Sequence, residues 1–403
     1  MVGEFESPRP RWRTGLSGVV AVVLIAALAS ASTYALVSGR ASRGGVGDSE
    51  SADDLAPLTE LYQALSDQAV DAPDRQDLVQ AAIEGMLDEV DDPYARYFPA
   101  TEFEEFSASL QGTFSGVGLM LEETPEGPVI VSVLEGTPAD RAGIEEGERI
   151  ISVDGENVSD EPLEQIVMKV KGDAGTTVRL GLAGGDAGAR ELQVTRAEFN
   201  LPDITTEMLD HNVGYINLLQ FVDGSSDRLR DEVRAMVDDG VEGIVLDLRE
   251  NPGGLLDESV TVASVFIENG PIVSVEERSR EREVFEAVGD AFERVPLAVV
   301  VDGHSASASE IVAGAIQDAD RGPIVGEQTF GKGTVQTIAQ LSDGSGAKFT
   351  TARYSTPSGD SIEGVGVTPD VEVAAGESGD VVQNDPQVQA AVDEIVGSDG
   401  EER

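Results

Sequence analysis

The chain lacks cysteine altogether and has only two histidines among its 403 residues. Without cysteine it can form no disulfide bond, no thiolate metal site and no cysteine nucleophile. The two histidines, His211 and His304, are too few for an imidazole-rich zinc centre. We therefore predict that the activity of this chain depends on neither a metal ion nor a cofactor.

Positive charge is also scarce, because 27 Lys and Arg side chains stand against 76 Asp and Glu side chains, for a net charge of −49. Nucleic-acid binding depends on basic side chains that displace counterions from phosphates, so we predict no nucleic-acid partner. The chain is long enough for two or three domains, and its 40% hydrophobic residues suffice for their cores. Four of the basic residues are lysine: Lys169, Lys171, Lys332 and Lys348.

One long hydrophobic run is present near the start of the chain, where residues 16–37 carry no charge. As a helix this run spans about 33 Å, enough to cross the hydrocarbon core of a bilayer. Arginines precede it and acidic residues follow it, so the positive-inside rule leaves residues 1–15 in the cytoplasm. We predict a single transmembrane helix over residues 16–38 that anchors the chain in the cell membrane. The alternative is a secretory signal cleaved after Ala31, and both place the rest of the chain outside the cytoplasm.

The remainder of the chain divides by composition. Residues 39–54 are rich in Gly, Ser and Asp, which is typical of a flexible linker. Residues 55–110 carry apolar side chains at helical spacing, and a break near Pro73 predicts two amphipathic helices. Their apolar faces pack either against the rest of the chain or against a second copy in a homodimer. Three segments follow: short strands in 111–197, alternating strands and helices in 198–376, and an acidic end in 377–403.

The segment of short strands resembles a PDZ domain over residues 111–197. The resemblance is carried by Gly116-Val117-Gly118-Leu119, by Gly136-Thr137-Pro138-Ala139 and by the run from Gly147 to Gly155. In PDZ domains the ligand adds a strand to the edge of a sheet, and a loop of backbone N–H groups captures its terminal carboxylate. The resemblance implies that Gly116, Val117, Gly118 and Leu119 bind the free C-termini of protein substrates. An apolar pocket at Leu119 suggests tails with nonpolar ends.

Two junctions between a strand and a helix carry the candidate chemistry. The first, Asp247 to Gly254, can turn backbone N–H groups outward at a helix start, where they bind a phosphate or an oxyanion. The negative net charge and the lack of a P-loop lysine argue against phosphate. The second, Gly303 to Glu310, holds Ser305, Ser307 and Ser309, which either cap the helix or supply a nucleophile.

A serine nucleophile needs a base, and the sequence offers an imidazole or a lysine. His304 lies in the serine turn itself, so a Ser-His pair stays open. The helix after the serines leads about 15 Å away and the strand 323–328 returns about 20 Å, which brings Lys332 level with the serines. In an extended chain Gln336 shares a face with Lys332 and can orient it. As a base Lys332 must have a pKa near 7, which a dry pocket near Phe330 would supply.

The combined pattern resembles the carboxyl-terminal processing peptidases, also called tail-specific proteases, which are Ser-Lys enzymes that carry a PDZ domain. The likeness covers residues 58–396. The phrases that carry it are 247–254, 305–318, 325–336, 350–359 and 366–370. The resemblance implies an α/β protease core of the crotonase/ClpP-like fold over residues 198–376, with an inserted PDZ domain, N-terminal helices and one transmembrane helix.

By motif position the resemblance implies that Ser307 is the nucleophile, Lys332 the general base and Gln336 the residue that holds the base. The oxyanion donors that it implies are the backbone N–H groups of Ala308 and of Gly253 or Gly254. The predicted function is a serine endopeptidase that recognises the C-terminal tails of proteins and cleaves through an acyl-enzyme. The alternative is a catalytically inactive PDZ adaptor on a protease-like scaffold.

Overall fold

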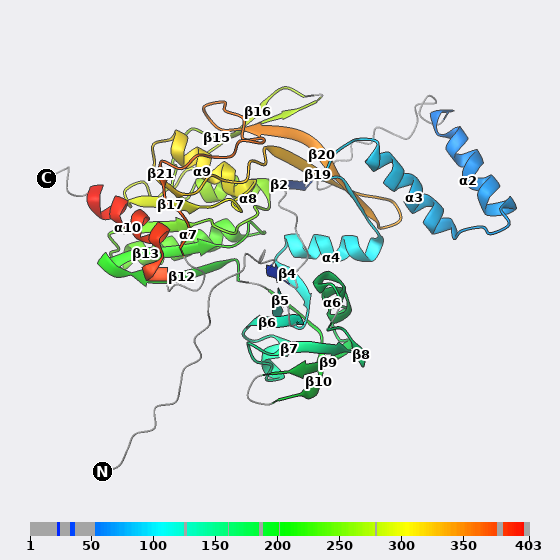
Figure 1. The fold of residues 1–403 in the computed structure, drawn as a ribbon. Coiled ribbons are helices and arrows are strands. Elements are labelled where there is room, and N and C mark those ends of the chain that lie inside the picture. Colours follow the sequence, from blue (N-terminus) through cyan, green and yellow to red (C-terminus); the bar gives the residue numbers. More distant parts are fainter. Residues whose placement is uncertain are drawn as a thin grey trace, which may run out of the picture. The chain divides into compact units, whose positions relative to one another are not determined.

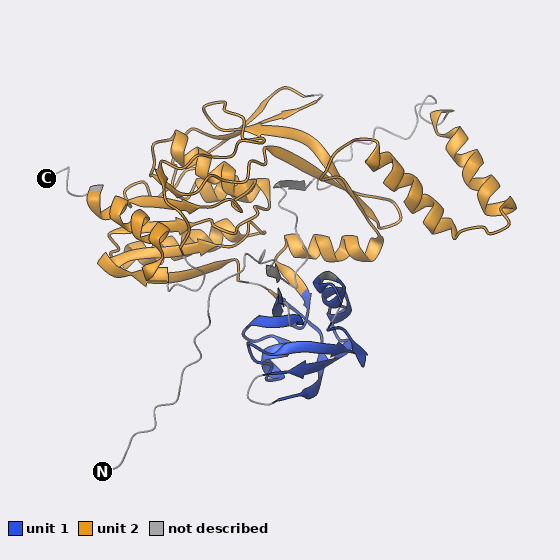
Figure 2. Cartoon of the chain, viewed as in Figure 1, with its two compact units in different colours: residues 1–28, 115–199 blue, residues 29–114, 200–403 orange. Residues whose placement is uncertain are grey.

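The computed structural model describes residues 22–24, 33–36, 53–124, 127–159, 161–184, 188–200, 202–278, 280–376 and 382–398 of the chain. The chain forms two compact units, which are coloured separately in Figure 2. Unit 1 consists of residues 1–28 and 115–199, and unit 2 of residues 29–114 and 200–403. Each unit has a hydrophobic core of its own.

Unit 1 is a sheet of order β1-β5-β6-β7-β9-β10, with β8 beside β7 (Figure 1). Along β9 the buried Val178, Leu180 and Leu182 are the residues that face the core, at the period of two that a sheet with one covered face requires. The elements of unit 1 are β1 (Val22–Leu24), β5 (Leu119–Thr124), β6 (Gly127–Val133), α5 (Pro138–Arg141), β7 (Arg149–Val153), β8 (Glu156–Asn157), α6 (Leu163–Val170), β9 (Thr177–Ala183) and β10 (Arg190–Thr195).

The prediction of a transmembrane helix over residues 16–38 is wrong. Two parts of this range are described, and both are strands: β1 pairs with β5, and β2 (Thr33–Leu36) pairs with β19. Their backbone groups are paired across sheet edges instead of along a helix. Among the described helices of the chain, none is both long and apolar enough to cross a membrane. The rest of the range lies outside the described residues, and the extracytoplasmic location stays a prediction.

Unit 2 is built on a six-stranded sheet of order β12-β13-β14-β17-β18-β21 (Figure 1). Neighbouring strands run parallel from β13 onward, and β12 is antiparallel. Val299 and Val301 of β17 pack with Ile311 of α9 on one face, while Val300 packs with Val388 of α10 on the other. Because both faces are covered, the central strands are continuous apolar runs.

The elements of this part are β12 (Ile204–Leu209), β13 (Val213–Leu218), α7 (Ser225–Asp238), β14 (Gly243–Asp247), α8 (Leu256–Ala263), β17 (Leu297–Val301), α9 (Ala308–Asp318), β18 (Ile324–Gly326), β21 (Val371–Glu372) and α10 (Pro386–Ser398). The helices α7, α8 and α9 contribute to the larger core cluster of the unit.

A second sheet of unit 2 has the order β16-β15-β20-β19-β2, with β3 beside β20. Its further strands are β3 (Arg96–Phe98), β15 (Pro271–Glu277), β16 (Glu283–Glu286), β19 (Thr334–Gln340) and β20 (Gly346–Ser355). The chain passes between the units through β4 (Thr113–Gly116) and β11 (Ala197–Asn200), which form a two-stranded sheet.

Three helices precede the PDZ-like segment: α2 (Ala56–Gln68), α3 (Arg75–Asp88) and α4 (Ala100–Leu110). The helix α4 buries Phe103 and Phe106 in a cluster with Phe98 of β3 and Ile338 of β19. Neither α2 nor α3 has a buried residue. The apolar faces predicted for these two helices are therefore only partly covered: Leu61 and Met86 are exposed, whereas Leu65 and Ile83 are half-buried.

Candidate active site

Two turns leave the same edge of the six-stranded sheet of unit 2. Strands β14 and β17 are parallel neighbours, so the turn after Asp247 and the turn after Val301 emerge side by side. Asn251 joins them, because its backbone oxygen accepts hydrogen bonds from Ala306 N (3.1 Å) and from Ser309 Oγ (2.9 Å). The two junctions singled out in the sequence therefore form one site.

The first turn brings Gly253 against the serine turn. Gly253 has φ +101°, and a Cβ there would lie 2.9 Å from Ala308 N and 2.9 Å from Ser307 Cβ. Its N–H donates to Asn251 Oδ1 (2.9 Å). A Cβ on Gly254 would instead lie 2.1 Å from the backbone oxygen of Phe221. Both positions require glycine, and Gly253 is the one whose side-chain direction faces the nucleophile.

Ser307 is held in a conformation that serine rarely adopts. It is buried, precedes α9 and has φ +60° and ψ −111°, a region of backbone space that costs free energy for residues other than glycine. The flanking serines support the turn: Ser305 Oγ donates to Leu248 O (2.8 Å), and Ser309 Oγ donates to Asn251 O. The hydroxyls of the two flanking serines are therefore bonded to backbone oxygens, which agrees with a nucleophile at the middle serine.

Glu310 connects the serine turn to the lysine turn. Its buried carboxylate accepts hydrogen bonds through Oε2 from Ser307 N (2.8 Å) and Lys332 N (2.9 Å). Through Oε1 it accepts from Thr329 Oγ1 (2.6 Å) and Gly331 N (2.7 Å). Burial raises the pKa of Glu310, while these hydrogen bonds oppose the rise. The sequence suggests only a helix-capping role for this residue.

Tyr354 ties the same two turns from the other side. Its buried hydroxyl donates to the backbone oxygen of Ser307 (3.0 Å) and to that of Lys332. Because Glu310 holds the two N–H groups and Tyr354 the two carbonyl groups, the main chains of Ser307 and Lys332 are fixed side by side. Sequence reasoning did not single out Tyr354, which comes from β20.

The amino group of Lys332 is buried, and burial lowers its pKa to about 7. The positive charge of Lys348 contributes to this lowering, whereas Glu363, Asp92 and Glu310 favour the charged form. The Nζ atom lies 4.2 Å from the centre of the Tyr94 ring. Lys332 is fully buried, as the dry pocket predicted near Phe330 requires, although Phe330 itself is 56% exposed.

Gln336 is fully buried in β19, and its amide is oriented by two threonines. Nε2 donates to Thr334 Oγ1 (3.0 Å) and to Thr350 Oγ1 (3.1 Å). Its Oε1 is buried and has no hydrogen-bond partner among the described residues. Gln336, the residue predicted to orient the lysine, is therefore itself fixed by hydrogen bonds, and its Oε1 can still accept one from a donor in the site.

His304 is the alternative base suggested by the sequence, and its side chain is 72% exposed. Its Nδ1 lies 2.9 Å from Glu250 Oε1 and 3.7 Å from Asp302 Oδ2. These three side chains could together hold a metal ion, since their ligand atoms lie within 4.8 Å of one another. The contact of Nδ1 with Glu250 directs the imidazole toward a solvent-exposed side chain.

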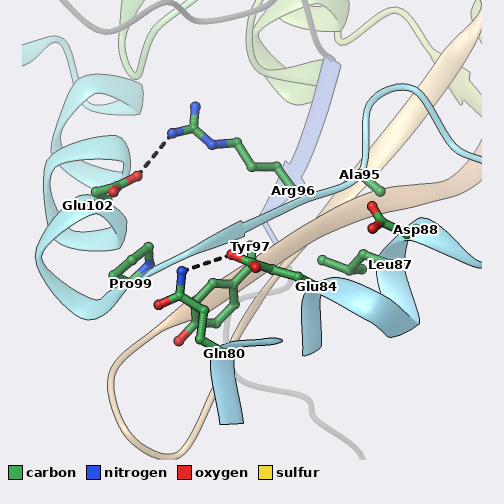
Figure 3. A pocket seen from close by; sticks show the side chains of 9 residues that line it. All are labelled: Gln80, Glu84, Leu87, Asp88, Ala95, Arg96, Tyr97, Pro99 and Glu102. Carbon is green, nitrogen blue, oxygen red and sulfur yellow. Dashed lines mark hydrogen bonds and ion pairs between the residues drawn. The ribbon is translucent and has the colours of Figure 1, made fainter. Parts of the chain in front are cut away.

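A pocket of about 340 Å³ lies in the N-terminal part of unit 2 (Figure 3). It lies at α3, β3 and the start of α4, and contains none of the predicted site residues. The lining residues are Gln80, Glu84, Leu87, Asp88, Ala95, Arg96, Tyr97, Pro99 and Glu102.

In unit 1 the predicted carboxylate-binding loop precedes and enters β5. Val117 and Leu119 are buried in the core of the unit, and Gly118 has φ +85° with Thr137 packed against it. The backbone oxygen of Val117 accepts from Ala139 N (2.8 Å). The edge of β5 beside this loop is paired with β1. The apolar side chain of Leu119 therefore contributes to the core.

Comparison with protein-family models matches peptidase family S41 over residues 212–373, a PDZ domain over 129–183 and the N-terminal domain of the activating protease CtpB over 24–101. The carboxy-terminal processing protease CtpA of Bacillus subtilis (strain 168) is 33% identical over 353 residues, which cover 87% of this chain and 76% of the relative. The chain belongs to peptidase family S41. This S41 peptidase is a serine-type C-terminal processing protease with a PDZ domain, as its sequence predicts.

Two further relatives agree with this assignment. The carboxy-terminal-processing protease of Bartonella bacilliformis is 38% identical over 328 residues, which cover 79% of this S41 peptidase and 75% of the relative. Among solved structures, the photosystem II D1 C-terminal processing protease is 31% identical, with a TM-score of 0.51 over 81% of this chain and 88% of that chain. The family thus holds for sequence and fold together.

Proposed function

We propose that this S41 peptidase cleaves peptide bonds by a Ser-Lys mechanism through an acyl-enzyme. Neutral Lys332 takes the proton of the Ser307 hydroxyl while Oγ attacks the carbonyl carbon of the substrate. The lysine then gives that proton to the leaving amine, and the acyl group stays on Ser307 as an ester. Water hydrolyses the ester with the lysine again acting as base.

One observation carries this proposal: a single oxygen of Glu310 accepts hydrogen bonds from the N–H groups of both Ser307 and Lys332. This shared oxygen holds the main chain of the strained serine beside that of a buried lysine with a pKa of about 7. Near neutral pH such a lysine is about half deprotonated and can accept a proton.

The oxyanion of the tetrahedral intermediate would lie between the two turns. Ala308 is the first residue of α9, so its N–H lies at the positive end of the helix dipole. The second donor is an N–H of the Gly253-Gly254 pair, whose turn lies against the serine turn. The N–H of Gly253 donates to Asn251 Oδ1 (2.9 Å), so Gly253 could donate to the oxyanion only by sharing or exchanging this bond.

The mechanism is tested by labelling the intact protein with a fluorophosphonate, which reacts with activated serines, and by measuring cleavage of an unfolded protein substrate. Ser307→Ala is expected to abolish both labelling and cleavage. Ser309→Ala changes a supporting serine and His304→Ala the alternative base, and both variants are expected to keep the label. A Ser307→Ala protein that still cleaves, or a His304→Ala protein without label, contradicts the mechanism.

We further propose that the PDZ domain selects substrates by their free, nonpolar C-termini. The strand to which a substrate tail would add in such a domain is β5, which follows the glycine loop. Since β1 pairs with this edge in the structure, a tail that adds there takes the place of β1.

This selection is tested with three substrates that share one unfolded body. One ends in three apolar residues, the second in three aspartates, and the third has the apolar end with an amidated C-terminus. We expect KM to be about tenfold lower for the first, because only it offers both an apolar side chain and a carboxylate. Equal KM values for all three exclude recognition of the tail.

Finally, we propose that α2 and α3 associate with a second copy of the chain. Their exposed apolar residues include Leu58 (41% exposed), Leu61 (56%) and Met86 (51%). Exposure of such residues to water is unfavourable, and groups of them often mark protein–protein interfaces. Light scattering after size-exclusion chromatography should show a dimer that Leu61→Asp converts to a monomer. A monomer at all concentrations refutes this association without affecting the catalytic proposal.

A further inference from the structure

The loop formed by Asp92, Pro93 and Tyr94 reaches the reaction centre from the N-terminal part of unit 2. This Asp-Pro-Tyr loop connects α3 to β3. Tyr94 presents the face of its ring to Lys332, with Nζ 4.2 Å from the ring centre. Nothing in the Ser-Lys chemistry requires a residue from this segment, which is more than two hundred positions distant in sequence.

Asp92 fixes the loop to the catalytic sheet with both of its carboxylate oxygens. Oδ2 accepts a hydrogen bond from Thr350 N (2.7 Å), and Oδ1 accepts one from Thr350 Oγ1 (3.1 Å). The same Oδ1 accepts from Tyr94 N (3.0 Å), so one carboxylate orients both the strand and the aromatic residue. The loop is therefore docked at a defined position on β20.

The docking continues to the residue that is predicted to hold the base. Thr350 Oγ1 donates a hydrogen bond to Asp92 and accepts one from Gln336 Nε2 (3.1 Å). Asp92, Thr350 and Gln336 thus form a chain of hydrogen bonds that ends in β19, next to the lysine turn. The loop therefore contacts the lysine through the Tyr94 ring, and its docking on Thr350 also helps to orient Gln336.

We propose that Tyr94 is a positioning residue for the Ser-Lys reaction, whose ring shields the Lys332 amino group from water, and that Asp92 keeps the ring in place. The inference rests on the proposed mechanism. Two properties of the ring oppose each other. Its carbon body excludes water and so favours the neutral amine, whereas its electron-rich face attracts the ammonium.

The charged groups around Lys332 set the background for this effect. Lys348 in β20 repels the ammonium, while Asp92, Glu310 in α9 and Glu363 attract it. Loss of water is the largest influence on the lysine, and it lowers the pKa. Removal of the ring therefore raises the pKa, because the admitted water outweighs the lost attraction of the ring face.

The test compares three substitutions at Tyr94 by the pH profile of kcat/KM on an unfolded substrate, between pH 5.5 and 10. The acid limb of this profile is the fall in kcat/KM at low pH, where Lys332 becomes protonated. Tyr94→Phe keeps the ring, so the acid limb stays at the wild-type position. Tyr94→Ala admits water, so the limb moves by about one unit toward alkaline pH, with about a tenfold loss at pH 6. Activity returns to within about threefold of the wild type at pH 10. Tyr94→Leu keeps an apolar body without the ring face, so its limb stays at the wild-type pH or moves toward acid.

Tyr97→Ala is the matched control, since it removes an aromatic ring from β3 that lines the pocket of Figure 3, and Lys332 is not among the residues that line this pocket. Its acid limb is expected to stay in place. A merely structural defect lowers kcat/KM at every pH and leaves the limb where it was, so near-UV circular dichroism of each variant accompanies the profile.

Two results overturn the inference: an unmoved limb in folded Tyr94→Ala, or a Tyr94→Leu limb displaced as far as that of Tyr94→Ala. The failure of the underlying mechanism has a different signature. It shows in the Lys332→Ala protein, which would then retain the activity and the acid limb of the wild type.

Discussion

Two lysines of unit 2 share an environment that lysine rarely occupies. Lys332 and Lys348 are both buried, and burial lowers the pKa of Lys332 to about 7 and that of Lys348 to about 8. They differ in their connections. The main chain of Lys332 is held by Glu310 of the nucleophile helix, whereas Lys348 lies opposite Arg96 in the pairing of β20 with β3. Burial lowers the pKa of both lysines, and the connection to Ser307 is what distinguishes Lys332 as the proposed base.

The sharpest separation of the two lysines is by activity. Lys332→Met removes the proposed base and should lower kcat/KM by about 1,000-fold or more at every pH. Lys348→Met removes a buried positive charge that is not part of the proposed Ser307-Lys332 pair, so activity at pH 9 should stay within about tenfold of the wild type. The measurement is cleavage of an unfolded substrate by both purified variants. Similar losses of activity in the two variants would contradict the proposal that Lys332, and not Lys348, is the base.

The same two variants separate the lysines by stability. A lysine with a folded pKa near 7 and an unfolded pKa of about 10.4 binds fewer protons when folded, so its contribution to stability rises with pH between these values and is absent below them. The difference in free energy of unfolding between wild type and Lys332→Met should change by about 4 kcal/mol from pH 6 to pH 11.

For Lys348→Met the corresponding change is about 3 kcal/mol, because the folded pKa of about 8 lies closer to the unfolded value. Urea unfolding at a series of pH values measures both differences. A difference that does not vary with pH would show that the lysine in question is not held below its ordinary pKa.

Glu310 is the contact that Lys332 has and Lys348 lacks among the described hydrogen bonds. Glu310→Gln replaces an oxygen by an amide NH₂, which is a donor and faces N–H groups that are donors as well. We expect the free energy of unfolding to fall by about 2 to 3 kcal/mol, with a parallel loss of activity. Glu286→Gln, at an exposed position of β16, serves as the control and should leave both unchanged. Equal stability of the two variants contradicts the role given to Glu310.

The smallest expected effect is the influence of one lysine on the other. The positive charge of Lys348 lowers the pKa of Lys332, so Lys348→Met should raise it and move the acid limb of kcat/KM toward alkaline pH by less than about one unit. The loss is then a few-fold at pH 6.5 and vanishes above the limb. Lys169→Met in unit 1 is the control. A limb that moves toward acid pH would mean that the two amino groups do not repel each other.

The sequence predicts those parts of the fold that depend on neighbouring residues. Residues 297–301 are an uninterrupted apolar run, which is typical of a buried strand and coincides with β17. Apolar residues continue from α8 to Ile267, yet the helix ends at Ala263, and Ser264 Oγ donates to Val260 O. The transmembrane prediction failed because hydropathy does not register that a sheet edge also satisfies the backbone of an apolar segment.

The candidate site likewise contains residues that the local sequence predicts and residues that it does not. Ser307 and Lys332 follow from motifs and from the lengths of one helix and one strand. Tyr94 and Tyr354 do not, because their contacts with the site arise only when distant strands pair. The bond from Thr350 to Asp92 joins residues that are 258 positions apart, and no local pattern marks it.

The helices α2 and α3 have no buried side chain, yet the Asp-Pro-Tyr loop follows α3 directly. Elements with so little burial open at a small free energy, and their amide hydrogens exchange quickly. Fraying that starts in α3 can release Tyr94 while the sheet behind Ser307 stays intact. On heating at slightly acidic pH, the activity of this protease should therefore fall before the catalytic core unfolds, and this early loss should report the opening of a helix pair.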